Sequence, residues 1–268
     1  MKFHLLVPLL LICCIACNSG DEQEAPASPV ASTPAIQHSL LNAYPHNTDH
    51  FTEGLLIHDG KLFESTGSPS KGDRSIIGYY DLATGKFDTK IELKDPQYFG
   101  EGIVFLNNKL YQLTYKNQTG FIYDAKTFKQ TGTFKFANKE GWGMTTDGQH
   151  LIMSDGTDGL TYLDPADQQP VKTLKVTENG IARDSLNELE YIKGYIYANI
   201  WLNNSIVKID PANGQVIGKA DLTALVLRAS MKYPEAEALN GIAYDSVNDK
   251  LYVTGKNWPE IYQIRLSE

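Results

Sequence analysis

Residues 99–115 read FGEGIVFLNNKLYQLTY, and this segment contains the pattern on which the fold prediction rests. Two runs rich in β-branched and aromatic residues flank the dipeptide Asn107-Asn108, which is typical of a tight turn between strands. The segment therefore predicts a β-hairpin whose first strand starts at the Phe-Gly-Glu-Gly sequence of residues 99–102.

The same hairpin recurs along the chain at a period of roughly 40–50 residues, the kind of repeat that indicates a propeller. Four further copies align with it, at residues 51–67, 140–156, 186–201 and 239–256. Between the copies lies a second unit, an aromatic-rich strand that runs into an Asp-containing turn, as in residues 77–85, 120–124, 160–165 and 206–214. Four strands in each of five repeats predict an all-β fold, a five-bladed β-propeller with antiparallel strands.

The end of the repeat array predicts how the ring closes. The last repeat supplies only a third strand, at residues 261–264, and residues 36–44 are expected to supply the missing fourth strand from the N-terminal side. The propeller domain is thus predicted to span residues 36–268. Residues 222–238 break the strand pattern and favour a short helix before Pro234.

Composition excludes several classes of protein. The chain has 268 residues, of which 42% are hydrophobic and 21% charged, so it has enough apolar residues for a large core. The net charge of −8 and the lack of Lys/Arg runs argue against nucleic-acid binding. No cysteine follows residue 17, which excludes disulfides, thiolate zinc sites and cysteine nucleophiles in the propeller.

The N-terminal residues have the composition of a targeting segment. Residues 1–16 combine a charged start with an apolar run, as in a secretory signal, and end directly before Cys17. This arrangement resembles a bacterial lipobox, so Cys17 is expected to carry lipid and residues 17–35, rich in Pro, Ala and Ser, to form a flexible linker. The expected location is the bacterial cell envelope, at the outer membrane facing the periplasm or the exterior, with the lipid anchor as the sole membrane contact.

Equivalent positions of the repeats predict a functional site. In a propeller the first strand of each blade lines the central channel, so the positions where the chain enters and leaves each hairpin should surround one opening. The first ring is Glu53, Glu101, Trp142, Asn187 and Asn240, and the second is Gly67, Tyr115, Gly156, Trp201 and Lys256. Carboxylates, carboxamides, an ammonium and large aromatic rings at one mouth predict a small-ligand pocket.

Other candidate sites are weaker. His46 and His50 are four residues apart just before a strand, where that spacing is not expected to put both rings on one face, so a metal site there is disfavoured. The sequence Ser154-Asp155-Gly156 has no histidine at an equivalent position of another blade, so a serine nucleophile is disfavoured as well.

The motifs of all five repeats, among them FTEGL at 51–55, FGEG at 99–102, GWG at 141–143, LNELEY at 186–191 and TGKNWP at 254–259, resemble the plant and bacterial type of glutaminyl-peptide cyclotransferase. The resemblance runs from about residue 43 to residue 264. It implies a five-bladed propeller that converts the N-terminal glutamine of peptides and proteins into pyroglutamate with release of ammonia. It implies no metal and no other cofactor, and we expect a monomer.

The resemblance also assigns site residues. It makes Glu101 the essential acidic residue, and the substrate-binding positions are Phe51, Glu53, Phe99, Tyr115, Trp142, Asn187, Trp201 and Lys256. Two of these depart from the plant sequences, since Tyr115 replaces a tryptophan and Glu53 replaces a glutamine. A second carboxylate at Glu53 is expected to raise the pKa of the pair that it forms with Glu101, which suits a proton shuttle near neutral pH.

Two other interpretations remain open at this stage. A metal-dependent propeller lactonase or hydrolase could hold Ca²⁺ among the oxygens of Glu53, Glu101, Asn187 and Asn240, although Trp142 and Lys256 interrupt such a ring. A non-catalytic binding propeller on the cell surface would account for the aromatic pocket, but it has no use for a buried acid–base pair.

Overall fold

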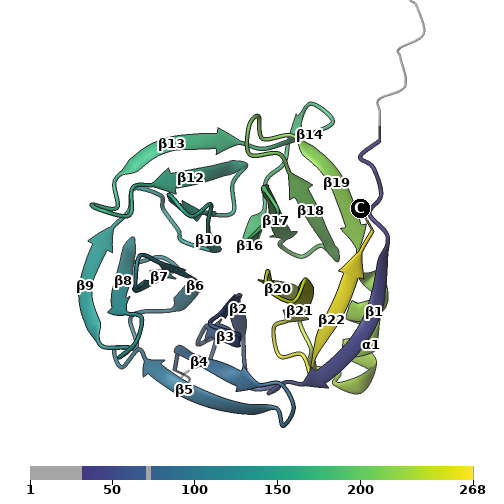
Figure 1. Ribbon diagram of the computed structural model, residues 1–268, viewed down its shortest axis with the longest axis horizontal. Helices are drawn as coiled ribbons and strands as arrows, with labels where there is room; N and C mark the ends of the chain where they lie inside the picture. Colours follow the sequence, from purple (N-terminus) through teal and green to yellow (C-terminus); the bar gives the residue numbers. More distant parts are fainter. Residues whose placement is uncertain (1–31, 71–73, 268) are drawn as a thin grey trace, which may run out of the picture. The chain divides into compact units, whose positions relative to one another are not determined.

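The computed structural model describes residues 32–70 and 74–267. Its strands form five four-stranded antiparallel sheets that surround a central axis like the blades of a propeller (Figure 1). The predicted all-β, five-bladed fold is confirmed. The predicted signal at residues 1–16, Cys17 and the linker up to residue 31 lie outside the described residues.

The blades follow one another along the chain, and each is built outward from the axis. Blade 1 contains β2 (Thr52–His58), β3 (Lys61–Thr66), β4 (Ile76–Asp81) and β5 (Lys86–Glu92). Blade 2 contains β6 (Gly100–Leu106), β7 (Lys109–Thr114), β8 (Thr119–Asp124) and β9 (Gln130–Lys135). Blade 3 contains β10 (Met144–Thr146), β11 (Leu151–Met153), β12 (Gly159–Leu163) and β13 (Pro170–Lys175).

Blade 4 contains β16 (Leu186–Ile192), β17 (Tyr195–Ile200), β18 (Ser205–Ile209) and β19 (Val216–Asp221). Blade 5 contains β20 (Leu239–Asp245), β21 (Lys250–Gly255) and β22 (Glu260–Leu266), with β1 (His38–Pro45) as its outer strand. A small hairpin of β14 (Thr177–Glu178) and β15 (Ile181–Ala182), which the repeat pattern does not predict, precedes blade 4.

Ring closure follows the prediction. The N-terminal β1 pairs antiparallel with the C-terminal β22, from His38 opposite Leu266 to Pro45 opposite Glu260. The chain just before β1 also touches blade 4, because the Ile36 amide donates to the carbonyl of Lys219 at 2.8 Å and the Lys219 amide donates to Pro34 at 2.9 Å. The N-terminal segment therefore ties blade 4 and blade 5 together.

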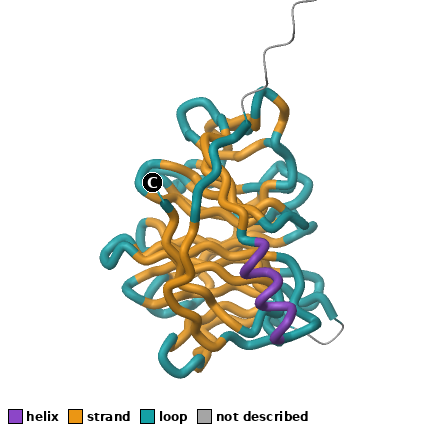
Figure 2. Tube along the Cα trace, turned by 90° about the vertical axis from the view of Figure 1, so that its right-hand side faces the viewer, coloured by secondary structure: helices purple, strands orange, loops and turns teal. Residues whose placement is uncertain are grey.

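The core lies between neighbouring blades, where apolar side chains of adjacent sheets interlock. One cluster joins blade 4 to blade 5 and includes the fully buried Trp258. The same cluster takes in Leu225 and Ala229 of the helix α1 (Thr223–Lys232), which Figures 1 and 2 show at the periphery of the ring. Packing of this apolar helix face against blade 5 fixes the helix beside the strands.

The helix predicted before Pro234 is confirmed. Asp221 Oδ1 accepts the Thr223 amide at 2.9 Å where the helix begins. At the other end Tyr233 takes an extended conformation, as a residue that precedes proline prefers, and the helix stops there. Nowhere in the described residues is there a helix with the length and apolarity needed to cross a membrane.

Candidate functional site

A β-bulge in the innermost strand aims the site residues of four blades. The ladder register between the first and second strands shifts across Thr52/Gly54, Gly100/Ile103, Leu186/Leu189 and Leu239/Ile242. A bulge leaves its extra residue unpaired and turns its side chain away from the regular alternation. The residues so released are those of the first predicted ring: Glu53, Glu101, Asn187 and Asn240.

Blade 3 lacks this bulge because its first strand is short. Strand β10 starts only at Met144, so Trp142 lies in the segment before it, with its carbonyl accepting the Gly102 amide at 2.8 Å. The inner strands of blades 2 and 3 are thereby joined beside the site. The repeat equivalence that placed Trp142 in the ring holds even though its local structure differs.

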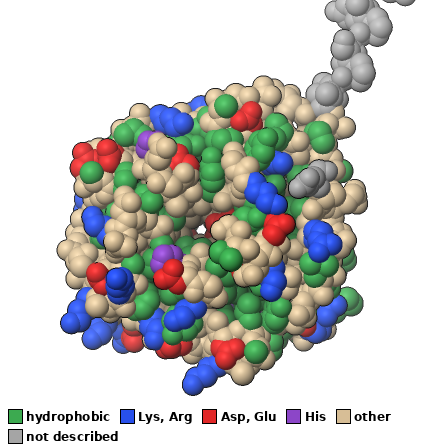
Figure 3. Space-filling view, in the orientation of Figure 1, with side chains coloured by type: hydrophobic (Ala, Val, Ile, Leu, Met, Phe, Trp, Pro, Cys, Tyr) green, Lys and Arg blue, Asp and Glu red, His purple; other side chains and the backbone are tan. Residues whose placement is uncertain are grey.

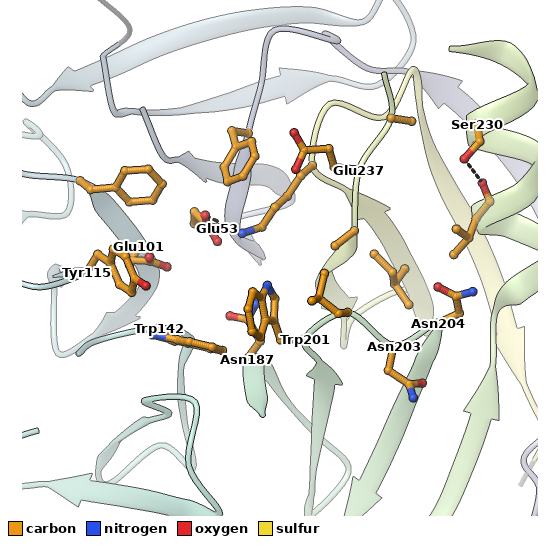
Figure 4. Close-up of a pocket in the computed structure, with 18 residues that line it drawn as sticks. Glu53, Glu101, Tyr115, Trp142, Asn187, Trp201, Asn203, Asn204, Ser230 and Glu237 are labelled. Carbon is orange, nitrogen blue, oxygen red and sulfur yellow. Dashed lines mark hydrogen bonds and ion pairs between the residues drawn. The ribbon is translucent and has the colours of Figure 1, made fainter. Parts of the chain in front are cut away.

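One cavity of about 600 Å³ collects the predicted residues (Figure 4). Glu101 and all the predicted substrate-binding residues line it: Phe51, Glu53, Phe99, Tyr115, Trp142, Asn187, Trp201 and Lys256. Figure 3 shows an opening at the centre of the ring, with an acidic side chain at its edge. The sequence equivalence thus identified residues that do converge in space.

The remaining ring positions support the cavity from behind. A Cβ at Gly67 would lie 2.1 Å from the Phe99 ring, and a Cβ at Gly156 would lie 2.7 Å from the Trp142 ring. Glycine at these positions therefore leaves room for the two aromatic rings. Asn240 is fully buried below the cavity, where its side-chain amide donates to the carbonyl of Thr52 at 2.9 Å and to Glu53 Oε2 at 3.2 Å.

Two carboxyl groups form the polar floor of the cavity. Glu53 and Glu101 are 2% and 4% exposed, and their carboxyl groups lie close enough to influence each other's ionisation. Burial raises the pKa of Glu53 to about 7, although the nearby Lys256 ammonium opposes the shift. Burial, followed by repulsion from Glu53, raises the pKa of Glu101 well above its usual value. The pair therefore holds a proton at neutral pH.

Lys256 balances this acidic pair. Its ammonium lies 2.7 Å from Glu53 Oε1 and 4.4 Å from the centre of the Phe51 ring. The lysine follows β21, and its amide donates to Ala238 while its carbonyl accepts the Glu237 amide, so the backbone on both sides of the residue is fixed. A cation–π contact and an ion pair together hold one positive charge at the cavity floor.

Aromatic rings build the walls of the cavity. Phe51 and Phe99 meet edge to face with centroids 6.2 Å apart, and Trp142 and Trp201 do so at 5.7 Å. The Trp142 indole N–H donates to Glu140 at 2.9 Å, which fixes the plane of that ring. Flat walls in fixed orientations suit a small substrate with a folded conformation.

Asn187 carries an open hydrogen-bonding position. Its side chain is 3% exposed, and within the described part of the chain its Oδ1 has no hydrogen-bond partner. A buried acceptor without a partner is costly, so such an atom beside a cavity is suited to receive an N–H from a bound ligand.

The structure adds cavity residues that sequence reasoning missed. The outer wall of the cavity, as we name it, consists of residues 202–204 after β17, Val226 and Ser230 of α1, and residues 236–239. The irregular segment 222–238 was visible in the sequence as an insertion between two blades. The sequence did not predict that this segment contacts the cavity, because an insertion has no equivalent in the other repeats.

The expectation that His46 and His50 would not share one face was wrong. His46 and His50 do come together, with ring centroids 5.9 Å apart, and their nitrogens lie 3.1 and 2.6 Å from the two oxygens of Glu64. They converge because the chain turns between them, where the His50 amide donates to the Asn47 carbonyl at 3.0 Å, instead of continuing as an extended strand. The ligand atoms lie within 4.8 Å of one another, a spacing compatible with a metal ion, but hydrogen bonds from Thr52 and the histidines already occupy the carboxylate.

Comparisons with known proteins agree with one another. A family model described as glutamine cyclotransferase matches residues 9–266. A protein of Arabidopsis thaliana named glutaminyl-peptide cyclotransferase is 41% identical over 238 residues, which cover 85% of this chain and 71% of the relative. The crystal structure of Myxococcus xanthus glutaminyl cyclase matches with a TM-score of 0.79 at 32% identity, covering 88% of this chain and 99% of that one.

Proposed function

The chain belongs to the glutamine cyclotransferase family, and from that premise we propose how its cavity converts the N-terminal glutamine of peptides and proteins into pyroglutamate with release of ammonia. The enzyme is an acyltransferase, in which the γ-acyl group of glutamine passes from its amide nitrogen to the α-nitrogen. The observation that carries the mechanism is the buried pair of Glu53 and Glu101, beside Lys256, on the floor of an aromatic cavity.

The first task of the cavity is to hold the folded conformer of glutamine. Both reacting groups belong to one residue, so the enzyme needs to orient them rather than bring two molecules together. The walls of Phe51, Phe99 and Trp142 enclose a space in which the side chain lies back over its own α-amine. The rigid edge-to-face contacts of these rings keep that space in shape.

Asn187 recognises the γ-carboxamide. Its free Oδ1 accepts an N–H of the substrate amide, which the carboxylate of a glutamate substrate lacks. A site that leaves a buried acceptor unpaired with the wrong substrate discriminates strongly against that substrate. Asn187 therefore selects glutamine over glutamate.

The carboxyl pair moves the protons. As the α-amine attacks the carbonyl carbon of the γ-carboxamide, a C–N bond forms and the amine gives up one proton to the pair. The pair returns one proton to the departing amide nitrogen, the old C–N bond breaks and ammonia leaves. Glu101 is the shuttle that touches the reacting nitrogens, and repulsion from the nearby Glu53 favours a state in which the two carboxyl groups hold one proton between them.

Lys256 stabilises the tetrahedral oxyanion. After its bond to Glu53 the ammonium retains further N–H donors, and it is the positive charge that lines the cavity floor. One well-aimed donor of this kind contributes about 3 kcal/mol to the transition state. Because Lys256 supplies the positive charge beside Glu53, the proposed reaction is independent of metal ions and is expected to continue in the presence of a chelator.

The test is direct. The purified full chain is incubated with a peptide that begins with glutamine, and mass spectrometry follows the loss of one ammonia. We expect conversion with and without EDTA, and none of a peptide that begins with asparagine, whose shorter side chain would close a strained ring. Folded protein that leaves the glutamine peptide intact would overturn the proposal, and loss of conversion with EDTA would overturn its metal-independent form.

The location is part of the proposal. The cysteine that ends the apolar N-terminal run, Cys17, carries lipid and holds the enzyme at the bacterial envelope, where two or more acyl chains anchor stably. Incorporation of labelled palmitate into the wild type, and its loss in Cys17→Ala, would support the anchor. Equal labelling of both proteins would contradict it.

A further inference from the structure

We propose that the outer wall of the cavity is a binding subsite for the residue that follows the N-terminal glutamine, and that it selects an apolar residue and disfavours an acidic one. The inference rests on the proposed cyclisation, because it assumes which group of the substrate enters the cavity. It adds a specificity that cyclisation does not require, since ring closure involves the first residue alone.

The size of the cavity leaves room for more than glutamine. A volume of about 600 Å³ corresponds to about twenty water molecules, and a glutaminyl residue has fewer than half as many heavy atoms. Glu101 and the predicted substrate-binding residues already surround the reacting groups. The outer part must therefore receive something else when substrate is bound.

The direction of the substrate decides what that is. The α-amine and the γ-carboxamide both have to reach Glu101 and Asn187, which lie at the buried floor. The carbonyl of glutamine, and with it the next residue, then points toward the open side, where Trp201 is 46% exposed. The second residue consequently lies against the outer wall, which Figure 4 shows beside Trp201, from Asn203 and Asn204 to Ser230 of α1.

The outer wall offers apolar contacts. Leu202 and Val226 face the cavity from two different elements, the turn after β17 and helix α1. Trp201, which is partly exposed, lines the same cavity. An apolar side chain at the second position of the substrate would cover surface that is now exposed to water.

Leu202 has a backbone conformation that is unusual for leucine. Its φ is +55°, in the left-handed region where Asn and Gly are favoured over other residues, and its side chain is 73% exposed. The strained backbone presents a large apolar side chain at the cavity mouth. Strain of this kind is typical of ligand-binding positions.

Charge disfavours an acidic residue at the same place. Glu237 lines the cavity and lies close enough to Glu53 to raise its pKa, and Glu140 does the same for Glu101. Against these carboxylates stand Lys256, already paired with Glu53, and Lys116, which lies 3.8 Å from Glu140 at the rim. Among the described residues no salt bridge pairs the Glu237 carboxylate, so a second-position aspartate would face its charge.

Four substrates test the proposal: glutaminamide, which has no second residue, and the dipeptide amides Gln-Leu, Gln-Ser and Gln-Asp. For the wild type we expect kcat/KM for Gln-Leu to exceed that for Gln-Ser by about tenfold, at the low end of hydrophobic discrimination because the subsite is open on one side. Gln-Asp should react more slowly than Gln-Ser, and added salt should narrow that difference.

Two variants assign the effect to residues. Leu202→Asn suits the positive φ and removes the apolar surface, so the Gln-Leu to Gln-Ser ratio should fall about fivefold. Glu237→Gln should raise the Gln-Asp to Gln-Ser ratio without changing the Gln-Leu to Gln-Ser ratio. The control is Val247→Asn, which changes an exposed apolar residue in the turn after β20 and should leave every ratio unchanged.

The outcomes separate the two proposals. Cyclisation of glutaminamide with equal kcat/KM for all three dipeptides would overturn the subsite and leave the proposed function intact. A Leu202→Asn variant that slows every substrate by the same factor would also overturn it, because that is the effect of general damage. If no substrate is cyclised, glutaminamide included, the proposed function fails and the subsite fails with it.

Discussion

The Lys256 ammonium and the Glu53 carboxylate form a buried ion pair, with 2.7 Å between Nζ and Oε1 and 8% and 2% of the two residues exposed. Glu53 belongs to the first blade and Lys256 to the last, so the pair bridges the interface between these two blades. The same contact serves the chemistry, because it holds one carboxyl group of the proton-carrying pair in place. The same two side chains therefore serve both the proposed catalysis and the contact between the first and last blades.

Replacing Glu101 with glutamine tests the proton shuttle. Glu101→Gln keeps the size of the side chain and its place in the bulge, but it removes the group that accepts and returns protons. We expect kcat on a Gln-initiated peptide to fall by at least about 100-fold, with the thermal midpoint nearly unchanged. Turnover close to that of the wild type would remove Glu101 from this role.

A matched control is available in the inner strand of blade 4. Desolvation raises the pKa of Glu190 to about 8, yet its carboxylate accepts the Tyr244 amide at 2.8 Å rather than lining the cavity. Glu190→Gln should leave kcat unchanged, which shows that loss of a carboxyl group with a raised pKa is not sufficient to stop turnover.

Replacing Glu53 tests how the pair sets the pH dependence. Below the pKa of the pair both carboxyl groups are protonated and neither accepts the amine's proton, so activity falls on the acid side. Glu53→Gln removes the like charge beside Glu101. It also leaves the Lys256 ammonium free to attract the Glu101 carboxylate, and both changes lower the pKa of Glu101.

The acid limb of kcat/KM against pH should therefore move to lower pH in Glu53→Gln, as measured with one peptide over a pH series. Because the pair would no longer share its proton, kcat should also fall, by less than in Glu101→Gln. An unchanged acid limb would mean that Glu53 does not contribute to the ionisation that controls activity.

Removing Lys256 tests the ion pair as a structural element. Lys256→Met leaves Glu53 buried without its cation, and loss of one partner from a buried pair costs about 3–5 kcal/mol. The pKa of Glu53 then rises above its present value of about 7. When folding raises the pKa of a carboxyl group, the protein loses stability as pH rises from the pKa of the unfolded state through that of the folded state. The free energy of unfolding of the variant should therefore be lower at high pH.

Urea unfolding of Lys256→Met at pH 6 and pH 9 measures this effect, with the larger loss expected at pH 9. The double variant Glu53→Gln/Lys256→Met removes the stranded charge and should recover much of the stability. A loss that is equal at both pH values, and not recovered in the double variant, would mean that lost packing of the lysine stem is responsible.

The repeats explain why so much of the fold and site could be predicted. Five copies of one hairpin fix the positions of the inner strands, and equivalent residues of equivalent strands must surround one axis. Glu101, Trp142 and Asn187 could therefore be placed together although 41 and 45 residues separate them along the chain. The same equivalence places Glu53 in the first predicted ring and Lys256 in the second, although it does not predict the ion pair that joins them.

Features outside the repeats could not be predicted in this way. Leu202 and Val226 reach the cavity from a turn and a helix that have no counterpart in other blades, and no periodic pattern says where such segments point. His46 and His50 were misjudged for a related reason, because the spacing argument assumed an extended chain where the structure has a turn. Hydrogen bonds to Glu64, distant in sequence, bring the two rings together.

The cluster around Glu64 makes a prediction about acid stability. Burial alone would raise the pKa of Glu64, but attraction to the imidazoles of His46 and His50 outweighs burial and holds it well below the ordinary value of 4.5. A carboxyl group whose pKa is lowered on folding stabilises the protein above its unfolded pKa. That contribution is lost as pH falls through the folded value.

Glu64→Gln should therefore have a free energy of unfolding about 3 kcal/mol lower than the wild type at pH 7, as measured by urea unfolding. The difference in free energy between the two proteins should narrow as pH falls below about 4. The surface pair of Glu92 and Arg74 provides the control, since both side chains are about half exposed and Glu92→Gln should cost under about 1 kcal/mol. A gap that stays constant with pH would show that the ionisation of Glu64 does not contribute.

Gly102 tests the close approach of two inner strands beside the shuttle. A Cβ at this position would lie 2.5 Å from the Met144 amide nitrogen and 2.6 Å from the Trp142 carbonyl oxygen, and neither backbone atom can move freely. Gly102→Ala should destabilise the protein by about 1–3 kcal/mol and, since it displaces Trp142 from Glu101, lower kcat as well. Gly132→Ala in β9 is the matched control, because its Cβ would meet the Ile122 side chain at 3.8 Å, and it should leave kcat unchanged. If Gly102→Ala matches Gly132→Ala in both urea unfolding and kcat, the contact between blades 2 and 3 does not position the site.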